Sequence, residues 1–127
     1  MDVTDLSTHA NQSISAVVVD YYRSIERQDF DAALSCFTHN AVYRRPGYEP
    51  FVGLQEISDF YHEARVISGG QHDLEAVIEQ GDMVAVHGSF HGTSRSGDSI
   101  HVRFSDFWRF SELQVIERDT YFAVAAV

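Results

Sequence analysis

A carboxylate stands among large apolar side chains in the stretch VRFSDFWRF, residues 102–110. The stretch alternates like a β-strand, and one side of it carries Val102, Phe104, Trp108 and Phe110. Asp106 falls on that same side, so we expect its side chain to face the protein interior. A buried carboxyl group tends to become neutral, and a neutral acid can donate a hydrogen bond to a developing oxyanion. The structural alternatives are an ion pair with Arg45 or Arg118, or a hydrogen bond to a helix end.

Two tyrosines could add hydroxyl groups to the same interior. Tyr21 lies on the apolar stripe of an expected first helix, and Tyr61 lies on that of a third helix. Each is either a core tyrosine with a satisfied hydroxyl or a hydrogen-bond donor in a pocket. Tyr22 is adjacent to Tyr21, and the pattern alone does not separate the two rings.

A pair of arginines ends an expected short strand before Pro46. We expect one of Arg44 and Arg45 to point inward and the other outward. An inward arginine would suit an anionic or carbonyl-bearing ligand, because its planar guanidinium offers several donors in a fixed geometry. The alternative is a structural pairing of Arg45 with Glu49 or Asp106.

Three of the seven histidines fall on one outer face of the expected sheet. His87 and His91 lie four residues apart on one strand, and a turn near Ser96 would bring His101 opposite His91. Three imidazoles could bind a metal, whereas solvation or burial in a subunit interface is the alternative. We predict no metal site, and the sequence contains no HExxH, phosphate-binding glycine loop or nucleophile elbow.

Composition limits the classes of function. With 127 residues, 44% of them hydrophobic, the chain is expected to form one globular domain. A net charge of -10 argues against nucleic acid and anionic membranes as partners. The N-terminal stretch lacks the pattern of a signal peptide, so a cytoplasmic location is the default expectation. The one cysteine, Cys36, is expected to be a buried inert thiol rather than a nucleophile.

Helices are expected first along the chain, and strands follow. The periodicity predicts helices over 13–28 and from Asp29 to about Phe37, a strand over 41–45, and a third helix from Gly53 to about Ala64. Four antiparallel strands should follow Gly69 and Gly70, over 72–79, 83–93, 99–110 and 114–122. The predicted fold class is therefore α+β, with three N-terminal helices on a curved, mostly antiparallel sheet that encloses an apolar pocket.

This order of elements, with VVVDYYRSIERQDFDAALSCF near its start and FSDFWRF and VIERDTYF near its end, resembles the nuclear transport factor 2-like superfamily. Within it, residues 13–122 are most similar to SnoaL-like proteins and their relative ketosteroid isomerase. The resemblance implies a cone-shaped fold, a deep apolar pocket and a homodimer formed through the outer sheet face. It also implies an oxyanion hole made by Tyr21 and Asp106, with Tyr61 close to them.

The sequence departs from the isomerase at the residue before the first-strand proline. The isomerase has its general base, an aspartate, at this point, and here Arg45 stands there. An arginine stays protonated and cannot accept a proton from a substrate. An Asp-Arg-Asp arrangement of the epoxide-hydrolase type would need a second inward aspartate, which the sequence does not place. The resemblance further implies that the last strand turns toward the pocket at Ile116, Arg118, Thr120 and Phe122.

We therefore predict a single SnoaL-like domain over 1–127, with a core over 13–122, a polar extension over 1–12 and a tail over 123–127. The predicted activity is a cofactor-independent isomerisation, cyclisation or hydrolysis of an apolar substrate that carries a carbonyl or epoxide. Asp106 and Tyr21 would be donors, and Arg45 an anchor or electrophile. The predicted wall consists of Phe60, Tyr61, Val86, Phe90, Trp108, Arg118 and Phe122. The alternative is a non-catalytic ligand-binding or dimerisation module, which the missing carboxylate before Pro46 favours.

Overall fold

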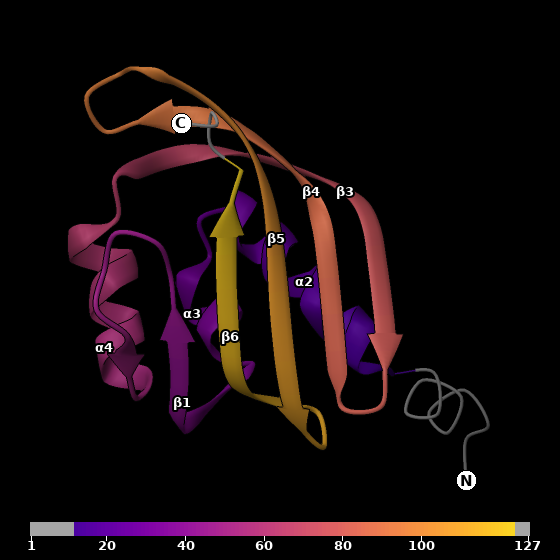
Figure 1. Ribbon diagram of the computed structural model, residues 1–127. Coiled ribbons are helices and arrows are strands. Elements are labelled where there is room, and N and C mark those ends of the chain that lie inside the picture. The colour runs from indigo at the N-terminus through magenta and orange to yellow at the C-terminus, as the bar shows by residue number, and fades with distance from the viewer. Residues whose placement is uncertain (1–11, 124–127) are drawn as a thin grey trace, which may run out of the picture.

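A bent six-stranded sheet with helices against one face forms the computed structural model, which describes residues 12–123 (Figure 1). The strand order is β2-β1-β6-β5-β4-β3, and every neighbouring pair is antiparallel except β1 and β6. The helical elements are α2 (Ile14–Glu26), α3 (Phe30–Leu34), α4 (Leu54–Asp59) and the π-helical turn η1 (Phe60–Ala64). The strands are β1 (Phe37–Arg44), β2 (Phe51–Val52), β3 (Ile67–Gln80), β4 (Met83–Ser94), β5 (Ser99–Ser111) and β6 (Gln114–Phe122).

The predicted α+β architecture is confirmed. The helices form one layer and the strands form the other, and β1 and β2 join the sheet from within the helical part of the chain (Figure 1). Within the described residues no helix is long and apolar enough to cross a membrane. The predicted extension, up to residue 11, and the predicted tail, from residue 124, lie outside the described residues.

Helix α2 begins where Ser13 caps it, with the serine side chain accepting a hydrogen bond from the Ala16 N–H at 3.1 Å. It ends at Glu26, slightly before the predicted Gln28, because Gln28 takes a left-handed φ of 59°. Its apolar face is wide enough to bury two adjacent rings, Tyr21 and Tyr22, under the sheet. Both hydroxyl groups therefore reach the interior.

Three boundaries differ from the predicted ones. The second helix ends at Leu34, and β1 begins at Phe37 because this residue pairs with Val115 of β6. Strand β3 begins before the two glycines rather than after them. A Cβ atom at Gly70 would lie 2.3 Å from the carbonyl oxygen of His91, so the glycine allows the close approach of β3 and β4.

The third predicted helix changes character midway. It is α-helical to Asp59 and then widens into the π turn η1, in which the Arg65 N–H donates to the Phe60 carbonyl at 2.9 Å. The wide turn buries the consecutive rings Phe60 and Tyr61. It also delivers Arg65 to the interior immediately after the turn.

The alternation predicted for β5 is confirmed. Asp106 is fully buried, in line with Phe104, Trp108 and Phe110, while Arg109 on the other side is exposed. Asp106 stands opposite Val86 of β4 and opposite Thr120 of β6. The carboxylate is thus held at the centre of the sheet, on the face toward the helices.

Candidate active site

A cavity of about 310 Å³ lies between α2, the η1 turn and the inner face of strands β3 to β6. Its volume is at the lower end of the range for small-molecule sites. The apolar part of its lining comprises Ile25, Val66, Ile67, Phe90, Ile100, Val102, Phe104 and Phe122. The polar part comprises Tyr21, Tyr22, Arg45, Tyr61, Arg65, His72, Asp106, Arg118 and Thr120.

Asp106 forms a buried ion pair with Arg118 from the neighbouring strand β6. The Arg118 Nη2 atom lies 2.8 Å from Asp106 Oδ2, and both side chains are almost completely enclosed. Burial disfavours the charged guanidinium, but Asp106 together with the surrounding tyrosine hydroxyls outweighs this effect, and the pKa of Arg118 is raised well above its usual range. The ion-pair alternative from the sequence is therefore the correct one for this carboxylate.

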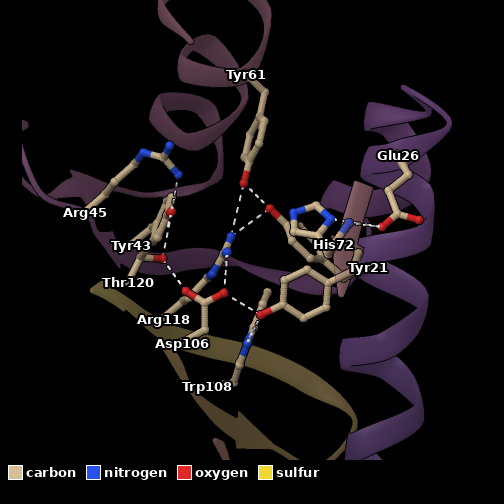
Figure 2. Close-up of polar contacts among 11 residues, drawn as sticks. Tyr21, Glu26, Tyr43, Arg45, Tyr61, His72, Asp106, Trp108, Arg118 and Thr120 are labelled. Carbon is tan, nitrogen blue, oxygen red and sulfur yellow. Dashed lines mark hydrogen bonds and ion pairs between the residues drawn. The ribbon is translucent and has the colours of Figure 1, made fainter. Parts of the chain in front are cut away.

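Every hydrogen bond to Asp106 is donated to it. The Tyr22 hydroxyl donates to Oδ2, and the Thr120 hydroxyl donates to Oδ1 (Figure 2). The Trp108 indole N–H in turn donates to the Tyr22 oxygen at 3.2 Å. This arrangement favours the ion-pair alternative over the predicted neutral donor, because an arginine and two hydroxyls already direct hydrogen bonds at the two carboxyl oxygens.

A directed chain of donors joins Arg45 to this carboxylate. The Arg45 Nη1 atom donates to the Tyr43 hydroxyl at 3.0 Å, and the Tyr43 hydroxyl lies 2.9 Å from the Thr120 hydroxyl. Because Thr120 donates to Asp106, the Tyr43 hydroxyl donates to Thr120. Arg45 therefore contacts Asp106 only through two hydroxyl groups, and it forms no direct pair with it.

Tyr21 and Tyr61 form a second cluster on the other side of Arg118. The Arg118 Nη1 atom donates to the Tyr21 oxygen at 2.7 Å and to the Tyr61 oxygen at 3.1 Å, and the two hydroxyls are hydrogen-bonded to each other (Figure 2). Burial raises the pKa of Tyr21 well above that of a free phenol, and Arg118 offsets only part of this shift. The phenol therefore stays protonated at neutral pH.

Counting hydrogens in this cluster leaves one donor unused. Tyr21 and Tyr61 have one hydroxyl hydrogen each, and their mutual bond uses only one of them. Arg118 supplies its own hydrogens to both oxygens. Among residues 12–123 the second hydroxyl hydrogen has no acceptor, and both tyrosines line the cavity. A ligand oxygen can accept it.

His72 brings a proton acceptor to the same cavity. Its backbone N–H donates to Glu26 Oε2 at 2.7 Å, and its ring Nδ1 lies 3.0 Å from the same oxygen. The carboxylate fixes the tautomer with hydrogen on Nδ1, which leaves a lone pair on Nε2. No other described residue is bonded to Nε2, and His72 lines the cavity.

The charge states of this dyad follow from burial and hydrogen bonding. Burial lowers the pKa of His72 to about 4, although its contact with Glu26 works in the opposite direction. Burial would raise the pKa of Glu26, but the hydrogen bonds from His72 and Arg23 outweigh it and lower the pKa. At neutral pH the pair is a neutral imidazole that rests on a carboxylate.

The two arginines that end β1 point to opposite sides, as predicted. Arg44 is exposed and pairs with Glu117 and Asp119 on the outer face. Arg45 lines the cavity, and its guanidinium lies 5.1 Å from the ring centre of Phe122. The predicted alternative pairing of Arg45 with Glu49 or Asp106 is not present among the described ion pairs.

The predicted wall is reproduced in part. Tyr61, Phe90, Arg118 and Phe122 line the cavity. Phe60, Val86 and Trp108 are buried in the core behind it and do not reach its surface. Burial raises the pKa of Cys36 to about 12, which agrees with the predicted inert thiol.

Sequence reasoning missed three polar residues of the site. Tyr22, rather than Tyr21, is the tyrosine that contacts Asp106. His72 could have been found, because it alternates in phase with the partly buried Leu74 on the same strand. Arg65 could not, since it follows a helical turn at a point where no periodic pattern applies.

The three outer-face histidines make separate contacts. The rings of His91 and His101 stack with their centres 3.9 Å apart, and His87 contacts Ser105 and Arg103. Over residues 12–123, no group of three or more potential ligands is arranged to hold a metal ion.

Comparisons with known proteins place the chain in a family. A family model of the SnoaL-like domain matches residues 18–118. A comparison with curated protein sequences finds no significant match. An NTF2-like protein of unknown function from Burkholderia pseudomallei superposes with a TM-score of 0.80 at 20% identity, which covers 88% of this chain and 92% of that chain.

Two further solved structures were determined with small molecules. TerC, co-crystallised with polyporic acid, gives a TM-score of 0.76 at 22% identity and covers 87% of this chain and 92% of that chain. A protein with a ketosteroid isomerase-like fold from Catenulispora acidiphila, in complex with trimethylamine, gives 0.75 at 14% identity and covers 85% of both chains. At such identities the likeness establishes the fold alone. With the family model spanning most of the sequence, the chain belongs to the SnoaL-like domain family.

Proposed function

We propose that the protein is an enzyme that enolises a carbonyl group on an apolar small molecule bound in the cavity. The observation that carries this proposal is the unused phenolic hydrogen of the Tyr21–Tyr61 pair, which faces the same cavity as the free Nε2 atom of His72. Enolisation needs these two functions together, a donor for the carbonyl oxygen and an acceptor for the adjacent proton.

The phenol pair suits an oxyanion because it is preorganised. Arg118 holds both oxygens in place, and Asp106 holds Arg118, so the donor need not reorient when negative charge develops on the ligand. The positive charge of Arg118 next to the phenols further stabilises an oxyanion that accepts their hydrogen bond. Asp106 is in this view a positioning residue rather than a catalytic one.

The base is His72 instead of the carboxylate that ketosteroid isomerase carries before its proline. The His72 pKa of about 4 is comparable with that of the isomerase's aspartate base, about 4.6. A neutral imidazole that faces an apolar cavity is ready to accept a proton throughout the neutral range. Glu26 then stabilises the imidazolium that forms.

The proposed step balances within the site. His72 Nε2 takes a proton from the carbon next to the carbonyl, and the electron pair of that C–H bond forms a C=C bond. The π electron pair of the carbonyl moves to its oxygen, which becomes an oxyanion and accepts a hydrogen bond from the phenol. Return of the proton to a different carbon gives an isomerisation, whereas attack of the enolate on a second carbonyl of the same molecule gives a cyclisation.

The test is the exchange of α-protons of 2-tetralone in D2O, followed by proton NMR. His72→Gln should slow the protein-catalysed exchange by about 100-fold or more, the usual contribution of a general base. Tyr21→Phe and Tyr61→Phe should each slow it by about 10- to 100-fold, because they break the donor pair. His39→Gln changes an exposed histidine on β1 and should leave the rate unchanged.

A specific observation favours a second candidate, a non-catalytic binding protein. Arg45 occupies the point at which the isomerase has its base, and it lines the cavity. In that case the wild type would bind ketones and acids but would exchange no protons above the rate of buffer. The same NMR experiment therefore separates the two functions.

A further inference from the structure

Arg65 is a buried cation without a hydrogen-bond or ion-pair partner among the residues that the structure describes. Its side chain is only 6% exposed, and Nε is enclosed with no hydrogen-bond acceptor. Among residues 12–123, no atom accepts a hydrogen bond from its guanidinium and no carboxylate forms an ion pair with it. Its guanidinium carbon lies 5.4 Å from the centre of the Tyr61 ring, in a cation–π contact.

The cavity as a whole carries an excess of positive charge. Three arginines line it, Arg45, Arg65 and Arg118, against one carboxylate, Asp106. Asp106 is already paired with Arg118. Arg45 donates a single hydrogen bond, to a neutral hydroxyl. Two guanidinium groups therefore face the cavity uncompensated, in a protein whose net charge is -10.

We propose that Arg65, assisted by Arg45, forms an anion subsite that takes the carboxylate of an apolar carboxylic acid. The inference rests on the proposed function for the choice of cavity, and it names the class of compound that the cavity selects. It does not require that the bound compound react.

Desolvation is the physical argument for a ligand at Arg65. The Arg65 Nε–H group has lost its water and gained no acceptor, which destabilises the fold, so its burial is explained when a ligand supplies the acceptor. A carboxylate matches the planar donors of arginine through two parallel hydrogen bonds. The apolar side chains that line the same cavity, among them Ile67, Ile100 and Val102, strengthen such an interaction because they lower the dielectric of the cavity.

The position of Arg65 also suits recognition of an entering ligand. The next residue, Val66, lines the cavity and is 58% exposed, so the cavity opens to solvent beside Arg65. The Tyr21–Tyr61 hydroxyls lie deeper, on Arg118. An acid held at Arg65 would direct its apolar body inward, toward these hydroxyls and His72.

The test compares an acid with its neutral isostere, 2-naphthoate against 2-naphthamide, by isothermal titration calorimetry on the full chain. We expect the wild type to bind the acid at least about tenfold more tightly. Arg65→Met should remove this preference, and Arg65→Gln should do the same with a polar side chain that retains a donor. Arg109→Met removes one charge from the exposed opposite face of β5 and should preserve the preference.

A second readout uses no ligand. Because the Arg65 Nε–H is enclosed without an acceptor and no carboxylate within residues 12–123 pairs with the guanidinium, Arg65→Met should raise the midpoint of thermal unfolding of the free protein. Equal affinities of the wild type for acid and amide, no binding of either, or an unchanged preference in both Arg65 variants would overturn the proposal. Selective binding of naphthoate without exchange of 2-tetralone protons would uphold the subsite and refute the proposed catalysis.

Discussion

The guanidinium of Arg118, on β6, lies 3.1 Å from the Tyr61 hydroxyl of the η1 turn and 2.8 Å from the Asp106 carboxylate on β5 (Figure 2). One guanidinium thus connects the structural ion pair of the sheet with the phenols that reach the ligand space. Substitution of Asp106 should therefore affect mainly stability, whereas substitution of the phenols should affect mainly ligand chemistry.

Removal of Asp106 should destabilise the protein strongly. Asp106→Leu leaves Arg118 buried and unpaired, and such a change typically costs about 3–5 kcal/mol in the free energy of unfolding. The double variant Asp106→Leu, Arg118→Met replaces both charges and should recover much of this loss. Urea unfolding of the wild type, the single variant and the double variant measures both effects. If Asp106→Leu alone were as stable as the wild type, the ion-pair assignment would be contradicted.

Substitutions of the two adjacent tyrosines of α2 should have different effects on stability and on ligand chemistry. Tyr22→Phe removes a donor to Asp106 and leaves the Trp108 N–H without an acceptor, at a cost of about 1–3 kcal/mol in the free energy of unfolding. Compared with Tyr22→Phe, Tyr21→Phe should lower the free energy of unfolding less and slow the exchange of 2-tetralone protons more. Urea unfolding and the NMR assay on this matched pair check both halves, and equal effects in both assays would argue against the division.

His72 should make stability depend on pH in the mildly acidic range. Its pKa is about 4 when folded against 6.5 in the unfolded chain, so the unfolded state binds more protons between these values. The free energy of unfolding should therefore fall as the pH drops from about 6.5 to 4, by an amount on the order of 3 kcal/mol. The charged groups that act on the ring are Glu26, Arg118 and Arg65.

The control for this pH dependence is His72→Gln, which cannot titrate. Urea unfolding at pH 7 and near pH 4.5 should show a larger drop for the wild type than for the variant. Glu26 loses its charge only at the acidic end, because its pKa is lowered. Parallel curves for the two proteins would show that the histidine is not desolvated.

The homodimer suggested by the resemblance remains a prediction, and the outer sheet face is the place to test it. Phe107 and Tyr121 are 41% and 57% exposed there, with ring centres 5.9 Å apart in an edge-to-face contact. The double change Phe107→Glu, Tyr121→Glu should convert a dimer into a monomer in light scattering after gel filtration, because like charges would face each other. Leu113→Glu, at an exposed residue between β5 and β6, is the control. A monomeric wild type would refute the prediction.

The sequence predicts which face a residue occupies better than it predicts the partner found there. Alternation in β5 was sufficient to turn Asp106 inward. The choice of Arg118 as its partner depends on the register between β5 and β6, where Arg118 stands opposite Trp108, one inward step from Asp106. Register is a property of two strands together, so the pattern of either strand alone left the ion pair and the neutral acid open.

The contacts to the ligand space were hardest to predict because they join distant segments. Tyr21 and Tyr61 lie 40 residues apart, and His72 meets Glu26 from 46 residues away. Arg65 owes its burial to the π turn, whose extra residue per turn has no signature in the hydrophobic periodicity. Hydrophobic periodicity was sufficient to predict the fold, whereas the contacts of the site depend on how the helices pack against the sheet.

A change in the length of the η1 turn would alter which ligand the cavity binds. Tyr61 is within the turn and Arg65 follows it directly, so the phenolic donor and the proposed acid anchor share five residues of backbone. The loss of one residue there would tighten the turn to an ordinary helix and redirect both side chains together. The sheet that carries Asp106 and Arg118 would be untouched. Selection can therefore alter what the cavity accepts through the length of a short surface-facing turn, while the scaffold beneath it retains its stability.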